Sequence, residues 1–234
     1  MKQGKAKKRL KKRLFEDGVY AWMEKLFDAV SLNLLWLLCS LPLVTIGASS
    51  TAFYYTMAKV IRGERGHLFG EFWRSFRLNF VKATIVWIAF AALIFLLLVN
   101  RNISADIAGS AGIGGYFGFF LLCLYTVIAV LFLGVLVYVF PVLSRFYMAV
   151  PQVIKLSVYM CFRYLPYTLG LLAICAGAAV MISFLPLLVI CVPAGALFCF
   201  SQLMESLLVR HTPVDTKGED RWYLDLAPRE GKNT

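Results

Sequence analysis

Two acidic side chains are the main candidates for chemistry in this sequence, because each borders a long uncharged run. Asp28 directly precedes the uncharged residues 29–58, and Glu205 directly follows the uncharged residues 164–204. A carboxylate at membrane depth is a candidate for binding or moving a proton or a cation. The alternative is a place at the membrane interface, or pairing with a nearby cation, namely Lys25, Lys59 or Arg210.

The other residue types that carry out chemistry are few and poorly placed for it. His67 and His211 lie in basic segments without carboxylate or cysteine neighbours, which is typical of solvated side chains. The six cysteines form no Cys-x-x-Cys pair, and all but Cys161 fall in apolar runs, where cysteine packs as a small hydrophobic residue. The sequence also has no phosphate-binding glycine loop, metalloprotease motif or nucleophile elbow. We therefore expect no metal, no cofactor, no disulfide and no enzymatic activity.

Long apolar runs make up most of the chain and must position these groups. Hydrophobic residues are 60% of the 234, and the uncharged runs cover residues 29–58, 83–100, 107–144 and 164–204. A membrane-spanning helix needs about 20 such residues, whereas the strands of an outer-membrane barrel alternate in segments of roughly 10. The pattern excludes a soluble enzyme and predicts an all-α, polytopic membrane bundle.

Helix breakers divide these runs into about six membrane segments. A turn at Pro186 divides the last run in two. The glycine-rich residues 108–115 leave room for one crossing before Pro141. Pro42 and Gly47 break the first run into a hairpin, whose two helices either span the membrane or are tilted, short or re-entrant. The predicted segments are 20–41, 48–61, 82–99, 116–140, 165–185 and 187–208.

The basic residues predict the orientation of these segments. If the chain turns back at residues 42–47, 23 of the 24 Lys and Arg residues lie on one side, and only Arg101 lies on the other. An excess of cations marks the cytoplasmic side of a membrane protein. Both ends are then cytoplasmic, and 100–115 is the main outer loop. No cleavable signal peptide is visible, and the expected location is a bacterial cytoplasmic membrane that the chain crosses several times.

Two cytoplasmic segments flank the membrane domain, which is predicted at residues 20–209. Residues 1–19 carry eight cations without interleaved aromatic residues before Phe15, which favours contact with anionic lipids and not with nucleic acid. Residues 210–234 form a tail that either stays flexible or docks a short helix on a partner or the bilayer.

Two amphipathic helices are predicted on the cytoplasmic face, at residues 69–80 and 144–162. In the first, aromatic residues that include Trp73 recur at three- and four-residue spacing, and Arg74 and Arg77 lie on the opposite side. These three side chains are candidates for contact with a partner. The similar surroundings of the two segments hint at a parallel internal repeat.

Residues 42–51 combine a helix stop with a turn and a row of small polar residues. Pro42 stops the first helix, and Gly47 permits the turn. The hydroxyls of Ser49, Ser50 and Thr51 can cap the next helix while the helices pack closely. This is a structural device first, although a helix N-terminus inside the membrane could also bind an anionic or hydroxyl-rich ligand.

The run from Asn33 to Tyr55, NLLWLLCSLPLVTIGASSTAFYY, and the aromatic and basic stretch 69–87 that follows it resemble the YesL family. This is a family of small bacterial integral membrane proteins of unknown function. Size and segment layout agree along essentially the whole chain, whereas the later crossings match only in hydropathy. The resemblance implies an association with carbohydrate uptake, above all with sugar ABC transporters. It assigns no catalytic residue.

Three functions are open at this point. The first is an accessory or interaction subunit of a carbohydrate ABC importer, with membrane lipids, the sugar permease and a second copy of the chain as candidate partners. The chain lacks the Glu-Ala-Ala loop by which such permeases hold their ATPase, so it is not expected to be the permease itself. The second is an oligosaccharide transporter in its own right. A membrane enzyme is the weakest of the three, because the outer face offers few titratable groups.

Overall fold

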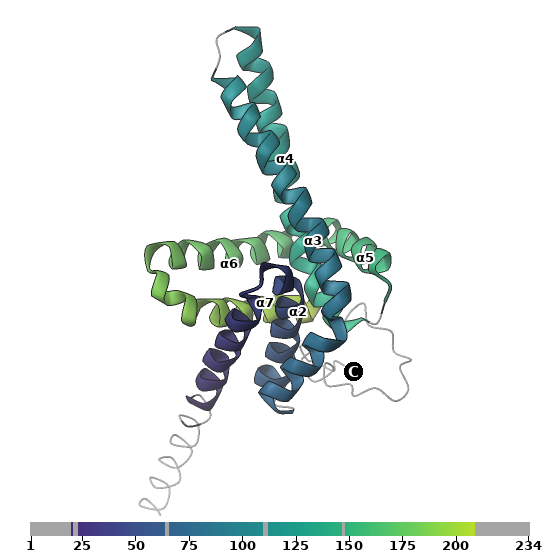
Figure 1. Ribbon diagram of the computed structural model, residues 1–234, viewed down its shortest axis with the longest axis vertical. Coiled ribbons are helices and arrows are strands. Elements are labelled where there is room, and N and C mark those ends of the chain that lie inside the picture. The colour runs from purple at the N-terminus through teal and green to yellow at the C-terminus, as the bar shows by residue number, and fades with distance from the viewer. Residues whose placement is uncertain (1–19, 21–22, 64–65, 110–111, 147, 209–234) are drawn as a thin grey trace, which may run out of the picture.

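The computed structural model describes residues 20, 23–63, 66–109, 112–146 and 148–208, and these residues form helices joined by short connections (Figure 1). The predicted basic segment 1–19 and the predicted tail 210–234 lie outside the described residues. After a first helix at residues 23–40, the elements are η1 (Leu43–Thr45), α2 (Ile46–Thr56), the π-helix η2 (Met57–Arg62), α3 (Leu68–Ala108), α4 (Ile113–Arg145), α5 (Val150–Arg163), α6 (Leu165–Phe184), η3 (Pro186–Ile190) and α7 (Val192–Leu208).

Three of these helices are long and apolar enough to cross a membrane. The most apolar 18-residue windows of α3, α4 and α6 have mean hydropathies of 2.5, 2.9 and 2.0, and no more than 17% of any of these windows is buried within the protein. Helix α7 is also apolar but shorter. Apolar surface of this extent is stable only in contact with lipid or other apolar surface. The chain is therefore a helical membrane protein.

Helices α3 and α4 form a long antiparallel hairpin that projects from the rest of the molecule (Figure 1). The prediction of separate helices at 69–80 and 82–99 is wrong, because α3 is continuous over 41 residues. No glycine or proline lies between the two predicted segments to interrupt it. At the far end of the hairpin, Gly112 has a φ of 86°, a conformation that glycine adopts without steric cost.

The helix α4 also differs from its predicted extent of 116–140. It begins at Ile113, three residues earlier, and continues through Pro141 to Arg145. Proline removes one backbone hydrogen bond from a helix interior and normally ends or kinks it. Here Pro141 and the next two residues are buried in the core, and this packing offsets the lost bond.

The first helix and α2 pack side by side as the predicted hairpin around Pro42. The first helix ends at residue 40, and Trp36 stacks on Phe53 of α2 with 5.3 Å between the ring centroids. Gly47 does not lie in the turn as predicted but inside α2. A Cβ at this position would lie 2.5 Å from the carbonyl oxygen of Ala83 in α3. Glycine is thus required here by the close approach of two helices.

The second half of the chain turns away from the α3–α4 hairpin. Helix α5 replaces the predicted helix 144–162 and starts later, where Pro151 occupies the first turn, a favoured place for proline in a helix. Helix α6 agrees closely with the predicted segment 165–185, but it runs across α3 and α4 instead of alongside them, and η3 and α7 lead the chain back (Figure 1). The described part of the chain is all-helical, as predicted, and α6 lies at a steep angle to the α3–α4 hairpin (Figure 1).

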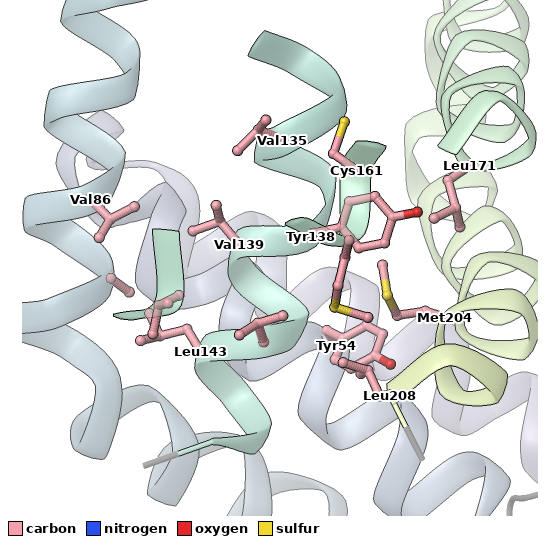
Figure 2. Packing of buried hydrophobic residues seen from close by; sticks show 14 of the residues in the cluster. Tyr54, Val86, Val135, Tyr138, Val139, Leu143, Cys161, Leu171, Met204 and Leu208 are labelled. Atoms are coloured by element: carbon pink, nitrogen blue, oxygen red, sulfur yellow. The ribbon is translucent and has the colours of Figure 1, made fainter. Parts of the chain in front are cut away.

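The main core lies where the base of the α3–α4 hairpin meets the other helices, at the end opposite the Gly112 turn. Residues from α2 to α7 interlock there (Figure 2). Among them, Tyr138 is fully buried, and its hydroxyl forms a 2.9 Å hydrogen bond with Thr168 of α6. The Thr168 hydroxyl also donates to the Cys161 carbonyl in α5. These bonds fix the orientation of α5 and α6 on α4.

Candidate functional site

A buried ionic cluster at the base of the α3–α4 hairpin contains one of the two predicted carboxylates. Glu205 of α7 has no exposed surface, and it accepts a 2.6 Å hydrogen bond from the hydroxyl of Tyr54 in α2. Its second carboxylate oxygen forms an ion pair with Arg145, whose side chain is only 4% exposed. With Arg62, which lies close to both Glu205 and Tyr54, we refer to these residues as the Glu205 cluster.

The cluster joins segments that lie far apart in the sequence. Tyr54 and Arg145 are 151 and 60 residues from Glu205, so the cluster holds α2, α4 and α7 together. Removing two charges from water costs several kcal/mol per ion, and only good geometry with further hydrogen bonds offsets that cost. In this cluster a hydroxyl donor contacts one carboxylate oxygen of Glu205 and a guanidinium contacts the other.

Among the described residues, the cation paired with Glu205 is Arg145, which was not one of the predicted partners, and the predicted partner Arg210 lies outside the described residues. Lys59, which the sequence offered as a partner, pairs with Glu71 of α3 at 3.0 Å and also donates to the Tyr55 hydroxyl. Sequence reasoning missed Arg145 as a buried residue. One signal was available: Arg145 is the only charged residue in the stretch from 107 to 154, directly after a long apolar run.

The π-helix η2 directs its two basic side chains toward two different helices. Lys59 faces α3, whereas Arg62 reaches α7, where it donates to the carbonyl oxygen of Ser201 at 2.6 Å and to the Gln202 side chain at 2.8 Å. Burial lowers the pKa of Arg62, and the nearby Glu205 partly offsets this effect. Single π-helical turns within α-helices are frequent at functional sites, and this one lies directly between two ion-pair clusters.

Arg62 gives a test of this arrangement. We expect Arg62→Ala to destabilise the protein by about 2 kcal/mol, because the variant loses charge-assisted hydrogen bonds to α7. The measurement is the unfolding temperature of the purified protein in detergent. Arg74→Ala is the matched control, since Arg74 is exposed on α3, and this substitution should leave the unfolding temperature almost unchanged. Equal effects of the two substitutions would contradict the role given to Arg62.

The hydroxyls predicted as helix caps have other roles. The N-cap of α2 is Thr45, and it makes no side-chain capping bond. Ser49 forms a 2.6 Å hydrogen bond with Ser40, and Ser50 accepts one from the Trp36 indole at 3.2 Å. Thr51 is buried and donates to the carbonyl of Gly47 within α2. The serines therefore bind the first helix to α2 across the Pro42 turn.

The remaining predicted residues lie outside the Glu205 cluster. Asp28 is half-buried in the first helix. Trp73 is 45% exposed on α3, where the Arg77 guanidinium lies over its ring at 4.9 Å, and Arg74 is exposed beside them. The structure thus places Trp73, Arg74 and Arg77 together, at the base of the hairpin and open to a partner or to lipid.

The part of the chain that the structure describes offers no group of three His, Cys, Asp or Glu residues that could hold a metal ion. All six cysteines are free, and burial raises the pKa of the Cys161 thiol, which makes it less reactive. The chemistry that the Glu205 cluster supports is charge pairing between helices.

Comparison with known proteins adds one finding. Residues 29–101 match DUF624, a protein family of unknown function. The matched stretch includes the hairpin around Pro42, η2 and most of α3, and it is consistent with the resemblance to the YesL family. No curated protein and no solved structure matches the chain. Over these residues, the chain is therefore similar to a family of proteins whose function is not known.

Proposed function

We propose that this protein is an accessory subunit that assembles with other membrane proteins, and that its partner is the permease of a carbohydrate ABC importer. The observation that supports assembly over transport is the use of the buried charges. Glu205 and Arg145 pair with each other, and Lys59 pairs with Glu71. These groups stabilise the protein's own helices, as expected of a scaffold. The choice of a carbohydrate importer as the partner rests on the resemblance of residues 33–55 to the YesL family.

A patch on α3 is the contact surface that we propose for the permease. It consists of Phe69, Trp73 and Arg77, which follow one another at about one helical turn, together with Arg74, which is next to Trp73 in the chain. Phe69 is 65% exposed and Trp73 is 45% exposed. Tryptophan and arginine are the residue types that most often dominate binding energy at protein interfaces. The cation–π pair of Trp73 and Arg77 also keeps both side chains ordered before a partner binds.

Recovery of the sugar permease with this protein tests the proposal. Tagged protein, solubilised in mild detergent from native membranes, should bring the permease with it. The double variant Trp73→Ala and Arg77→Ala should reduce that recovery at least about tenfold, which corresponds to 1.4 kcal/mol of binding. Phe184→Ala is the control, because Phe184 is 81% exposed in a different helix. Recovery of the protein alone, together with unchanged sugar uptake in a deletion strain, would contradict the proposal.

A transporter is the second candidate, and η2 is the observation that favours it. Single π-helical turns are frequent at functional sites, and ionisable residues at membrane depth mark ion or substrate pathways in many membrane proteins. Oligosaccharide flux into proteoliposomes that contain only this protein would support this function. Flux that Glu205→Gln and Asp28→Asn left unchanged would remove both carboxylates from the transport path.

A further inference from the structure

The uncharged, apolar part of α3 defines where the hydrocarbon layer of the membrane lies along this helix. It begins after Lys82 and ends before Arg101, and its 18 residues span about 27 Å at about 1.5 Å per residue. This length is close to the roughly 30 Å of a hydrocarbon core. Helix α4 lies antiparallel beside the same residues, with the rings of Phe90 and Phe132 only 4.7 Å apart. The α3–α4 hairpin therefore fits the membrane as a pair of crossings.

The first helix and α2 form a hairpin whose tip, around Leu43, reaches only the edge of this hydrocarbon layer. Gly47 packs against Ala83, and the Trp87 indole donates to the carbonyl of Leu43 at 2.8 Å. Trp87 is five residues beyond Lys82, which corresponds to about 8 Å along the helix. A hairpin that crossed the membrane would instead have its tip beside the other end of the apolar part, near residue 100.

The turn between α6 and α7 also lies on the side of the membrane where Lys82 marks the edge of the apolar layer. The side-chain amide of Asn33 donates to the carbonyl oxygens of Val189 and Ile190 in η3, both at 2.7 Å. Asn33 comes ten residues before Leu43, so it is about 15 Å back from the tip along the first helix. A turn at the outer face of the membrane could not contact it.

From these depths we infer that, of the helices that the structure describes, only α3 and α4 cross the membrane. The first helix and α2 enter the lipid from the basic side and return to that side, and the α6–η3–α7 unit lies against the lipid at the basic face. The occupants of their exposed apolar surface are acyl chains of that single leaflet. The side chains that contact them include those at the tip and at the α6 end, namely Leu41, Leu43, Val44, Phe184 and Leu187, which are 75%, 74%, 52%, 81% and 75% exposed.

Two further observations agree with this topology. The apolar tip is continuous with the lipid-facing surface of α3, where Ile85 and Ile88 are 56% and 50% exposed beside Trp87. Two crossings also satisfy the charge distribution. With α3 and α4 as the two crossings, 23 of the 24 basic residues remain on one side, and only Arg101 lies on the other.

Labelling of single cysteines from outside intact cells tests the inference. In a full-length chain whose six native cysteines are replaced by alanine, Leu43→Cys, Leu187→Cys and Ile113→Cys are introduced one at a time. Ile113 is 89% exposed at the far end of the α3–α4 hairpin and serves as the control. We expect a membrane-impermeant maleimide to label Ile113→Cys, and to label the other two at less than about a tenth of its rate. A variant that does not fold is replaced by Val44→Cys or Leu185→Cys.

The same variants, purified and labelled with a polarity-sensitive fluorophore, are then reconstituted with brominated phospholipids. Probes at residues 43 and 187 should be quenched, because bromine on the acyl chains lies next to them. Labelling of either residue from outside at the rate of residue 113 would show a full crossing and overturn the inference. Absence of quenching at both residues would overturn the contact with lipid, and an unlabelled residue 113 would overturn the orientation.

Discussion

Glu205→Ala should destabilise the protein by about 3 to 5 kcal/mol, because it leaves the buried guanidinium of Arg145 without its carboxylate. The Tyr54 hydroxyl loses its acceptor at the same time. Few single substitutions reach this size. The measurement is the thermal unfolding of purified protein in detergent or nanodiscs, followed by circular dichroism. Glu24→Ala is the matched control, since Glu24 is exposed on the first helix, and it should leave stability nearly unchanged.

A double substitution separates a lost charge pair from a general loss of packing. Replacing both members of a buried ion pair with apolar residues of similar volume is often neutral or stabilising, whereas removing one member is costly. Glu205→Leu combined with Arg145→Met should therefore be markedly more stable than Glu205→Ala. If the double variant were as unstable as Glu205→Ala, the cost would come from the packing of α7 and not from the unpaired charge.

Gly47→Ala should destabilise the protein by about 3 kcal/mol. The added Cβ would lie 2.5 Å from the Ala83 carbonyl oxygen and 2.6 Å from the Trp87 Cβ, so α2 and α3 must move apart. Overpacking of this kind typically costs about 1 to 3 kcal/mol, and backbone atoms cannot rotate away as a side chain can. The same thermal unfolding measurement applies.

Gly195→Ala is the control for this prediction, because it makes the same chemical change inside α7. A Cβ there meets nothing within 4 Å, and alanine favours a helix over glycine by about 1 kcal/mol. Gly195→Ala should therefore be neutral or slightly stabilising. A similar loss of stability in the two variants would show that the contact of Gly47 with α3 is not what makes glycine necessary.

Hydropathy gave the helical segments more reliably than it gave their arrangement. The predicted segment 165–185 differs from α6 by one residue at its end, because long apolar runs between helix breakers are a local signal. The direction of α6 across the α3–α4 hairpin is set by contacts such as that of Thr168 with Tyr138. Such contacts depend on which faces of distant helices meet, and hydropathy carries no information about this.

The candidate site shows the same division. Glu205 could be selected from sequence because a carboxylate at the end of a 41-residue uncharged run is unusual. Its partner Arg145 could not, because pairing across 60 residues depends on how α4 and α7 pack. The sequence predicts that Gly47 permits a turn, whereas its close contact with Ala83 exists only once α3 is folded beside it.

The sequence by itself determined that this is a helical membrane protein with a break at Pro42. Composition and periodicity suffice for those statements, because they follow from the free energy of placing each residue in water or in lipid. Only the tertiary structure decided which buried charges pair and how deep each helix lies against α3. Both depend on contacts between segments up to about 150 residues apart, which form only when the helices pack.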